Sequence, residues 1–175
     1  SYNYLEEVFE LFTTAHPDVA TLAQESGMSE RERDAFLAVF NESNPNTTLG
    51  FAVMGGIFGE GIDLVGERLV GAIIVGVGLP QICVERDLIK QYFNERGISG
   101  FEYAYTYPGM NRVLQAAGRV IRTDKDRGAI LLVDRRFGQN RYRQLFPPSW
   151  RAVQSVRDPG HIAQELKDFW IDDPM

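Results

Sequence analysis

The sequence lacks several features that would assign it to a familiar class of protein. Its single cysteine, Cys83, excludes an internal disulfide framework and any all-cysteine metal or iron–sulfur site within this chain. No apolar run approaches the roughly 18 residues of a membrane span, and there is no N-terminal signal pattern. No Gly-Lys-Ser/Thr follows the glycine-rich segment, so the chain has no Walker-type phosphate loop. We therefore expect a cytoplasmic protein with no membrane partner.

The charge of the chain is unevenly distributed. The formal net charge is -6, yet residues 111–143 contain nine basic and three acidic residues, which leaves nine basic and 21 acidic residues elsewhere. This asymmetry indicates one surface that handles anions, while the acidic remainder keeps the protein soluble. From charge alone, a solvated basic helix face remains the alternative. With 175 residues and 44% hydrophobic composition, the chain can build the core of one domain.

Helical and strand-like patterns alternate along the chain. Apolar spacing predicts helices over residues 4–12, 82–96 and 110–121, and a capping box predicts another that begins at Ser29. Apolar runs predict strands over residues 19–23, 49–54, 69–77 and 128–133, the last two fully buried. The alternation predicts an α/β fold with a mostly parallel sheet and helices on both faces. Such sheets bind ligands at the carboxyl ends of their strands.

Three further expectations concern organisation. Residues 101–107 carry aromatic side chains at alternate positions, which favours a half-buried strand or a domain contact over a base-stacking surface. The chain opens with a helix where a parallel sheet would normally supply a strand, so we expect a piece of a longer protein. We expect residues 1–175 to form a single domain, with residues 147–175 as a C-terminal extension packed on it.

Residues 55–63, GGIFGEGID, place four glycines directly after a predicted strand. Glycine lets the backbone turn tightly and lets a phosphate or sugar approach closely. Glu60 and Asp63 would repel phosphate, so their expected partners are hydroxyls, amides or an arginine. A tight turn without a ligand is the alternative.

Residues 115–122, QAAGRVIR, place Arg119 and Arg122 three residues apart on a predicted helix, where like charges repel. An anionic ligand would account for the pair, because a guanidinium forks onto phosphate oxygens and stabilises a transferring phosphoryl group. Gln115, one turn before Arg119, could orient a water or hold a phosphate oxygen, and Gly118 permits close packing. The alternative is a surface helix whose arginines pair with acids elsewhere.

Four segments, GGIFGEGIDL, GVGLP, QAAGRVIR and GAILLVDRRF, occur in this order along the chain. The ordered set resembles the second RecA-like motor domain of DinG/XPD-type superfamily 2 DNA helicases, over residues 1 to about 148. The resemblance implies that Arg119 and Arg122, with Gln115 beside them, reach the γ-phosphate of ATP across a cleft between two motor domains, Arg122 being the finger. It also implies nucleotide-site roles for Gly61, Asp63 and Gly118, and a DNA path along Ser1, Tyr2, Glu60, Arg135 and Arg136.

The resemblance further implies cofactors and partners that this chain does not hold alone. ATP with Mg²⁺ would be bound mostly by a first motor domain, the N-terminal half of the same protein, and single-stranded DNA would cross both halves. An iron–sulfur cluster, where relatives carry one, would also lie outside this chain, which has no metal site of its own. The chain alone is then expected to be inactive. A self-contained nucleotide-binding regulatory module and a non-catalytic scaffold piece of a DNA-repair complex remain the alternatives.

Overall fold

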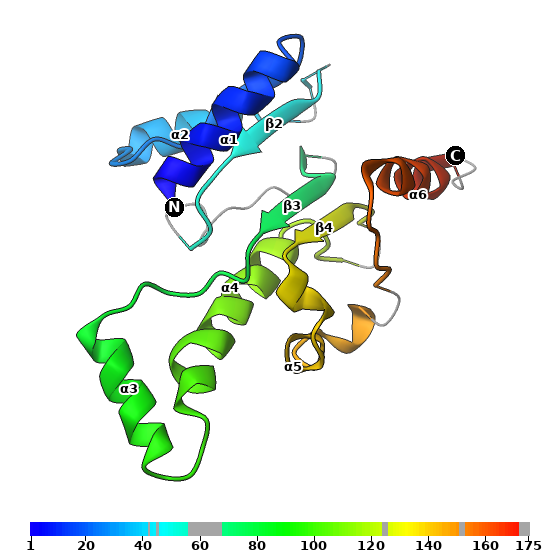
Figure 1. The fold of residues 1–175 in the computed structure, drawn as a ribbon. Helices are drawn as coiled ribbons and strands as arrows, with labels where there is room; N and C mark the ends of the chain where they lie inside the picture. Colours follow the sequence, from blue (N-terminus) through cyan, green and yellow to red (C-terminus); the bar gives the residue numbers. More distant parts are fainter. Residues whose placement is uncertain (42, 45, 56–67, 124–125, 151–152, 172–175) are drawn as a thin grey trace.

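The computed structural model describes residues 1–175 apart from residues 42, 45, 56–67, 124–125, 151–152 and 172–175 (Figure 1). Its helices are α1 (Tyr2–Ala15), α2 (Glu30–Ala38), α3 (Val84–Asn94), α4 (Tyr107–Ala117), α5 (Asn140–Arg143) and α6 (Pro159–Ile171). Its strands are β1 (Ala20–Ala23), β2 (Thr48–Phe51), β3 (Gly71–Val75) and β4 (Ala129–Val133). Shorter helical turns are η2 (Glu102–Thr106), η3 (Arg135–Gly138) and η4 (Pro148–Trp150). Within the described ranges, no helix is long and apolar enough to cross a membrane.

The strands pair in parallel, as the alternating pattern predicts. β1 pairs with β2, and β3 pairs with β4 in a register that sets Gly71 opposite Ala129 and Val75 opposite Val133. Parallel neighbours need long crossover connections, which α2 supplies between β1 and β2 and which α3, η2 and α4 supply between β3 and β4. The predicted α/β class with a parallel sheet is therefore confirmed.

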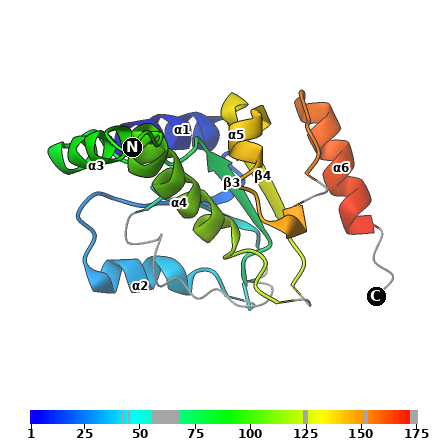
Figure 2. The same cartoon turned by 90° about the horizontal axis from the view of Figure 1, so that it is seen from below.

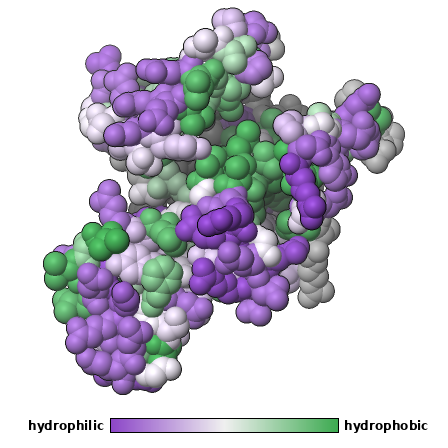
Figure 3. Space-filling model, in the orientation of Figure 1, coloured by the Kyte–Doolittle hydropathy of each residue, from purple (hydrophilic) through white to green (hydrophobic). Residues whose placement is uncertain are grey.

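The predicted full burial of β3 and of β4 is wrong, since β4 is half-buried and Val133 at its end is exposed. Ile74 is buried, but Ile73 and Val75 are 63% and 45% exposed. Successive side chains of a strand point to opposite faces, and α4 covers the face that carries Ile74 (Figures 1 and 2). The other face forms the apolar surface near the centre of Figure 3. An unbroken apolar run predicts strand structure, but it does not tell which face a helix covers.

The main core lies between α4 and the β3–β4 pair. Met110, Val113 and Ala117 recur at helical spacing, so they form one stripe along α4. This stripe packs with side chains from β3, η3 and α5, and the buried set is Ile74, Val77, Met110, Val113, Ala117, Phe137 and Tyr142. The position of α4 on β3 is therefore set by side-chain packing.

A smaller aromatic cluster holds α1 on the β1–β2 pair. Phe9 meets Phe51 edge to face at 5.3 Å between ring centroids, and Phe12 lies 5.7 Å from the same ring. The capping box predicted at Ser29 is present, because the Ser29 side chain accepts from the Glu32 N–H and the Glu32 carboxylate accepts from the Ser29 N–H. These hydrogen bonds lower the pKa of Glu32.

Of the two structures favoured for the aromatic residues 101–107, the half-buried strand is wrong, because this region is helical and continues directly into α4, while the domain contact stays a prediction. Phe101 contacts Tyr105, and Tyr103 contacts Tyr107, with ring centroids 5.2 and 5.1 Å apart. A separation of four residues fits both a strand of period two and a helix of period 3.6. Aromatic spacing alone therefore does not distinguish the two structures here.

Two glycines set how closely α4 approaches the end of β3. A Cβ added to Gly109 would lie 2.6 Å from the carbonyl oxygen of Val77, and one added to Gly78 would lie 2.8 Å from that of Gly109. Gly78 also has a φ of +63°, a conformation that side chains disfavour. Backbone meets backbone at this crossing, so no side chain can turn aside to make room.

We predict that Gly109→Ala destabilises the chain by about 1–3 kcal/mol, the usual cost of overpacking. Helix propensity alone predicts the opposite sign, a gain of up to about 1 kcal/mol. Urea unfolding decides between the two. Gly138→Ala is the control, because nothing lies within 4 Å of an added Cβ there. A stabilised Gly109→Ala variant would show that the crossing has room to spare.

Candidate functional site

Helix α4 carries the chain from one edge of the β3–β4 pair to the other. At its start, Gly109 lies against the backbone that follows β3, from Val77 to Leu79. Beyond its end, the side chain of Val120 lies against Gly128, which immediately precedes β4. We call the edge at which β3 and β4 end the carboxyl edge, and the edge at which they begin the amino edge. Because α4 runs antiparallel to β3, residues just before it and just after it lie at opposite edges.

The two arginines of QAAGRVIR lie after the helix, which ends at Ala117 and not at Ile121 as predicted. Gly118 is the cap residue, and its N–H donates to the Leu114 carbonyl at 2.8 Å. Glycine is a poor helix former, and the contact of Val120 with Gly128 takes the chain off the helical path. Arg119 and Arg122 therefore do not share a helix face, and the expected repulsion within a helix does not arise.

Asp126 holds the backbone around Arg122. One carboxylate oxygen accepts from the N–H of Arg122 and from the N–H of Thr123, both at 2.8 Å. These two hydrogen bonds lower the pKa of Asp126, and the nearby charge of Arg122 acts in the same direction. The arrangement fixes the main chain from which the half-buried Arg122 side chain projects. Sequence reasoning missed Asp126, although an acid four residues after an arginine in a loop was a usable signal.

The structure brings four predicted residues together at the amino edge and leaves three undescribed. Gln115 and Gly118 are exposed near the end of α4, and Arg119 and Arg122 are half-buried just beyond it. Glu60, Gly61 and Asp63 lie outside the described residues, so their predicted roles stay predictions.

At the carboxyl edge of the β1–β2 pair, a buried glutamine links three segments. Gln24 is 3% exposed, and its side-chain amide donates to the Tyr2 hydroxyl at 2.9 Å. Its side-chain oxygen accepts from the N–H of Val53 at 2.8 Å. Ser1 caps α1 by accepting from the N–H of Tyr4 at 3.4 Å. The predicted positions Ser1 and Tyr2 thus lie beside the carboxyl ends of β1 and β2, and Gln24 was missed.

Arg112 joins the loops that follow β2 and β3. Its Nη1 donates to the Gly78 carbonyl at 3.4 Å, and a Cβ on Gly55 would lie 2.9 Å from its Nε. Gly55 has a φ of +82°, so glycine suits this position for two separate reasons. Arg112 therefore brings the loops after β2 and β3 together, because its guanidinium contacts both of them. No local sequence signal distinguishes Arg112 from the other arginines of the basic region.

Arg135 and Arg136 follow β4 and differ in their surroundings. Arg136 makes a two-pronged contact with Asp134, with Nε to Oδ1 at 3.0 Å and Nη2 to Oδ2 at 2.7 Å. This hydrogen-bonded pair lowers the pKa of Asp134 and raises the pKa of Arg136. Arg135 is exposed. The predicted contacts of Arg135 and Arg136 with nucleic acid both stay predictions. The guanidinium of Arg136 is already hydrogen-bonded to Asp134.

The residues that the structure describes contain no cluster of three or more His, Cys, Asp or Glu side chains that could hold a metal ion. At the two edges the carboxylates of Asp126 and Asp134 are already hydrogen-bonded within the chain, and guanidinium groups, backbone amides and hydroxyls lie beside them. Such groups bind phosphate oxygens, by charge and by hydrogen bonds. The arrangement can therefore engage anionic ligands at two separate places, near the carboxyl ends of the parallel strands and near the amino ends of β3 and β4.

Comparison with known proteins gives a consistent result. A family model described as the helicase C-terminal domain matches residues 1–153. A regulator of telomere elongation helicase 1 homolog from Culex quinquefasciatus is 31% identical over 158 residues, which cover 80% of this chain and 16% of that protein.

Two further relatives match shorter stretches. The ATP-dependent DNA helicase DinG of Photobacterium profundum is 31% identical over 105 residues, or 57% of this chain and 15% of that protein. A probable ATP-dependent helicase of Methanocaldococcus jannaschii is 33% identical over 97 residues, or 50% of this chain and 15% of that protein. The chain thus spans only about a sixth of the length of the curated relatives that it matches.

We predict that Arg136→Ala destabilises the chain by about 1 kcal/mol at pH 7, between the values for exposed and buried ion pairs. Asp134 has a lowered pKa in the folded state, so the stability it contributes is present above the ordinary pKa of about 3.9 and is lost as the pH falls through the lowered value. The difference between the variant and the unmodified protein should therefore shrink below about pH 4.

Urea unfolding at pH 7 and at acid pH measures this difference. The matched control is Arg135→Ala, which should change stability by less than about 0.5 kcal/mol because that side chain is exposed. An equal effect of Arg136→Ala at both pH values would contradict the role given to the Asp134 pair.

Proposed function

The chain belongs to the helicase C-terminal domain family, and we propose that it is the second motor half of an ATP-dependent DNA helicase. Membership confirms the resemblance that the four ordered motifs predict. The activity of the whole protein is inferred, because the matched segments make up only about a sixth of these relatives. The observation that carries the proposal is the course of α4, which leads from the carboxyl edge to the two arginines at the amino edge.

At the amino edge we assign the nucleotide-facing role. Arg119 and Arg122 would stabilise negative charge on the transferring γ-phosphoryl group, with Arg122 as the finger. Asp126 would keep the Arg122 backbone in place through its two hydrogen bonds. Gln115 and Gly118 complete this edge. When bound, ATP with Mg²⁺ supplies the phosphoryl group and part of the charge neutralisation, and we assign the metal ligands to the first motor domain.

At the carboxyl edge we assign the nucleic-acid track. The Tyr2 hydroxyl, oriented by Gln24, and the exposed Arg135 can contact phosphate oxygens from two different strand ends. Phosphate contacts of this kind position a strand without reading its sequence. We propose single-stranded DNA as the partner, because it fits such contacts and because the Photobacterium profundum relative is a DNA helicase. Helix α4 then connects the two edges as one packed body.

We further propose that residues 147–175 form an extension packed on this single domain. The family model ends at residue 153, and α6 lies beyond it. The guanidinium carbon of Arg127 lies 4.6 Å from the centroid of the Phe169 ring and 5.4 Å from that of Trp170, and Arg127 also donates to the Phe169 carbonyl. Since Arg127 follows Asp126, the extension touches the loop that holds Arg122.

We predict that the 175-residue chain alone shows no measurable ATP hydrolysis, while the longer protein hydrolyses ATP and is stimulated by single-stranded DNA. An arginine finger acts only on a bound nucleotide, and most of the groups that bind the nucleotide are assigned to the first motor domain. In the longer protein, Arg122→Ala should lower the hydrolysis rate by about 10³- to 10⁵-fold, as for other fingers.

Arg157→Ala, at an exposed position outside both edges, is the control and should keep full activity. Appreciable hydrolysis by the chain alone would contradict the proposal and favour the self-contained nucleotide-binding module. A longer protein that is silent with intact motifs would instead favour the non-catalytic scaffold.

A further inference from the structure

We propose that a cleft formed by Arg143, Phe146 and Trp150 binds one unstacked base, with its neighbouring phosphate, of a single-stranded nucleic acid. The inference rests on the proposed function, because it names a contact of the nucleic-acid track. None of these three residues was among those predicted from the sequence.

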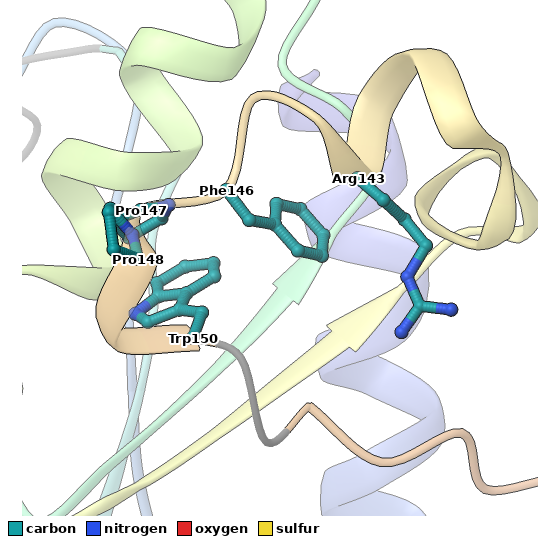
Figure 4. Close-up of a pocket in the computed structure, with 5 residues that line it drawn as sticks. All are labelled: Arg143, Phe146, Pro147, Pro148 and Trp150. Atoms are coloured by element: carbon teal, nitrogen blue, oxygen red, sulfur yellow. The ribbon is translucent and has the colours of Figure 1, made fainter.

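The shape of the cleft suits a flat ring. It has a volume of about 320 Å³ and is lined by Arg143, Phe146, Pro147, Pro148 and Trp150 (Figure 4). Phe146 and Trp150 meet edge to face, with centroids 5.3 Å apart and an angle of 62° between the rings. Two rings at this angle form a corner that presents an aromatic face to an incoming group. The volume is at the lower end of the range of roughly 300–1,000 Å³ for ligand pockets, which limits the occupant to a small group.

The rings are held in place before any ligand arrives. Phe146 and Trp150 are half-buried and pack at the margin of the main core, and Phe146 also lies 6.3 Å from Phe137. A ring that is already ordered loses little conformational freedom when a base stacks on it. Stacking on such fixed aromatic side chains is the usual way in which proteins hold single strands without reading sequence.

The charge around the cleft suits a polyanion. Residues 135–143 contain four arginines and no acidic residue. Arg136 is engaged by Asp134, and Arg141 lies over the Tyr142 ring at 5.0 Å. Arg143 is exposed, and Figure 4 shows it beyond Phe146 on the side away from Trp150. Its guanidinium is thus placed to meet a phosphate next to a base that occupies the aromatic corner.

The cleft is continuous with the carboxyl edge. A neighbouring groove of about 580 Å³ shares Arg143, Phe146 and Trp150 with it and extends along β4 to Asp134. Arg135, one residue further, was predicted to contact nucleic acid. A nucleic-acid strand that follows the carboxyl edge can therefore reach the cleft without crossing the β3–β4 pair.

A peptide partner explains less of this arrangement. A neutral proline-rich peptide would use the rings but would gain nothing from the arginines. An acidic peptide would use the arginines but has no need of an aromatic corner. A nucleic-acid strand uses both features, since it alternates flat bases with charged phosphates.

The test compares the affinity of the full-length protein for two polymers of equal charge, oligothymidylate and an abasic deoxyribose-phosphate oligomer of the same length. Trp150→Leu should weaken oligothymidylate binding by about 5- to 150-fold, the range for one lost stack, and leave binding of the abasic oligomer unchanged. Trp150→Phe keeps a ring and should restore most of the affinity. Arg143→Ala should weaken both polymers alike and reduce the slope of log affinity against log salt by about 1.

The matched control is Trp170→Phe, which alters the other tryptophan, on α6, and should change neither affinity. Unchanged affinities for both polymers in Trp150→Leu and in Arg143→Ala would overturn the inference. The proposed function would still hold if the full-length protein showed ATP hydrolysis stimulated by DNA. A proline-rich peptide whose binding is lost in Trp150→Leu, beside unchanged oligothymidylate binding, would overturn it in favour of a protein partner. If the unmodified full-length protein neither binds oligothymidylate nor hydrolyses ATP, the proposed function itself fails. Should Trp150→Leu not fold, the exposed Arg143→Ala still decides the question, because unchanged affinity for both polymers in that variant would overturn the inference.

Discussion

The contact between α4 and β3 positions the candidate residues that precede and follow α4. The backbone crossing at Gly78 and Gly109 sets the start of the helix at the carboxyl edge. The apolar stripe of α4 then sets the direction of the helix along β3. The contact between Val120 and Gly128 places the residues after the helix at the amino edge. A bulkier residue at the crossing would shift the helix and, with it, the arginines at its far end. The two edges thus depend on one packing contact.

Hydrogen bonds from polar side chains complete what this packing begins. Asp126 shapes the loop of Arg122 at the amino edge, and Gln24 and Arg112 tie strand ends together at the carboxyl edge. Each of the three joins its own side chain to main-chain groups, so the loops are held by their backbone. Such preorganisation is what phosphate recognition requires, because charge stabilisation is most effective when the groups need not reorganise.

The elements were largely predictable from the sequence, and their ends and exposure were not. Periodicity and the capping box at Ser29 predict most helices and strands, because these signals are local. The end of α4 at Ala117 was missed, since apolar residues continue to Ile121, a single glycine only weakens a helix, and the contact of Val120 with Gly128 is a tertiary one. Gln24 and Arg112 were missed for a similar reason, because their partners lie 22 to 34 residues away in the chain.

Nucleotide and nucleic acid are proposed to meet opposite ends of the parallel strands. Photo-crosslinking of the full-length protein tests this proposal directly, with an azido-ATP in one sample and a thiothymidine oligonucleotide in another, followed by peptide mapping. We expect the nucleotide to label the segment around Arg119 and Arg122 and the oligonucleotide to label the segments around Tyr2 and Arg135. Labelling of one common segment by both probes would contradict the proposal.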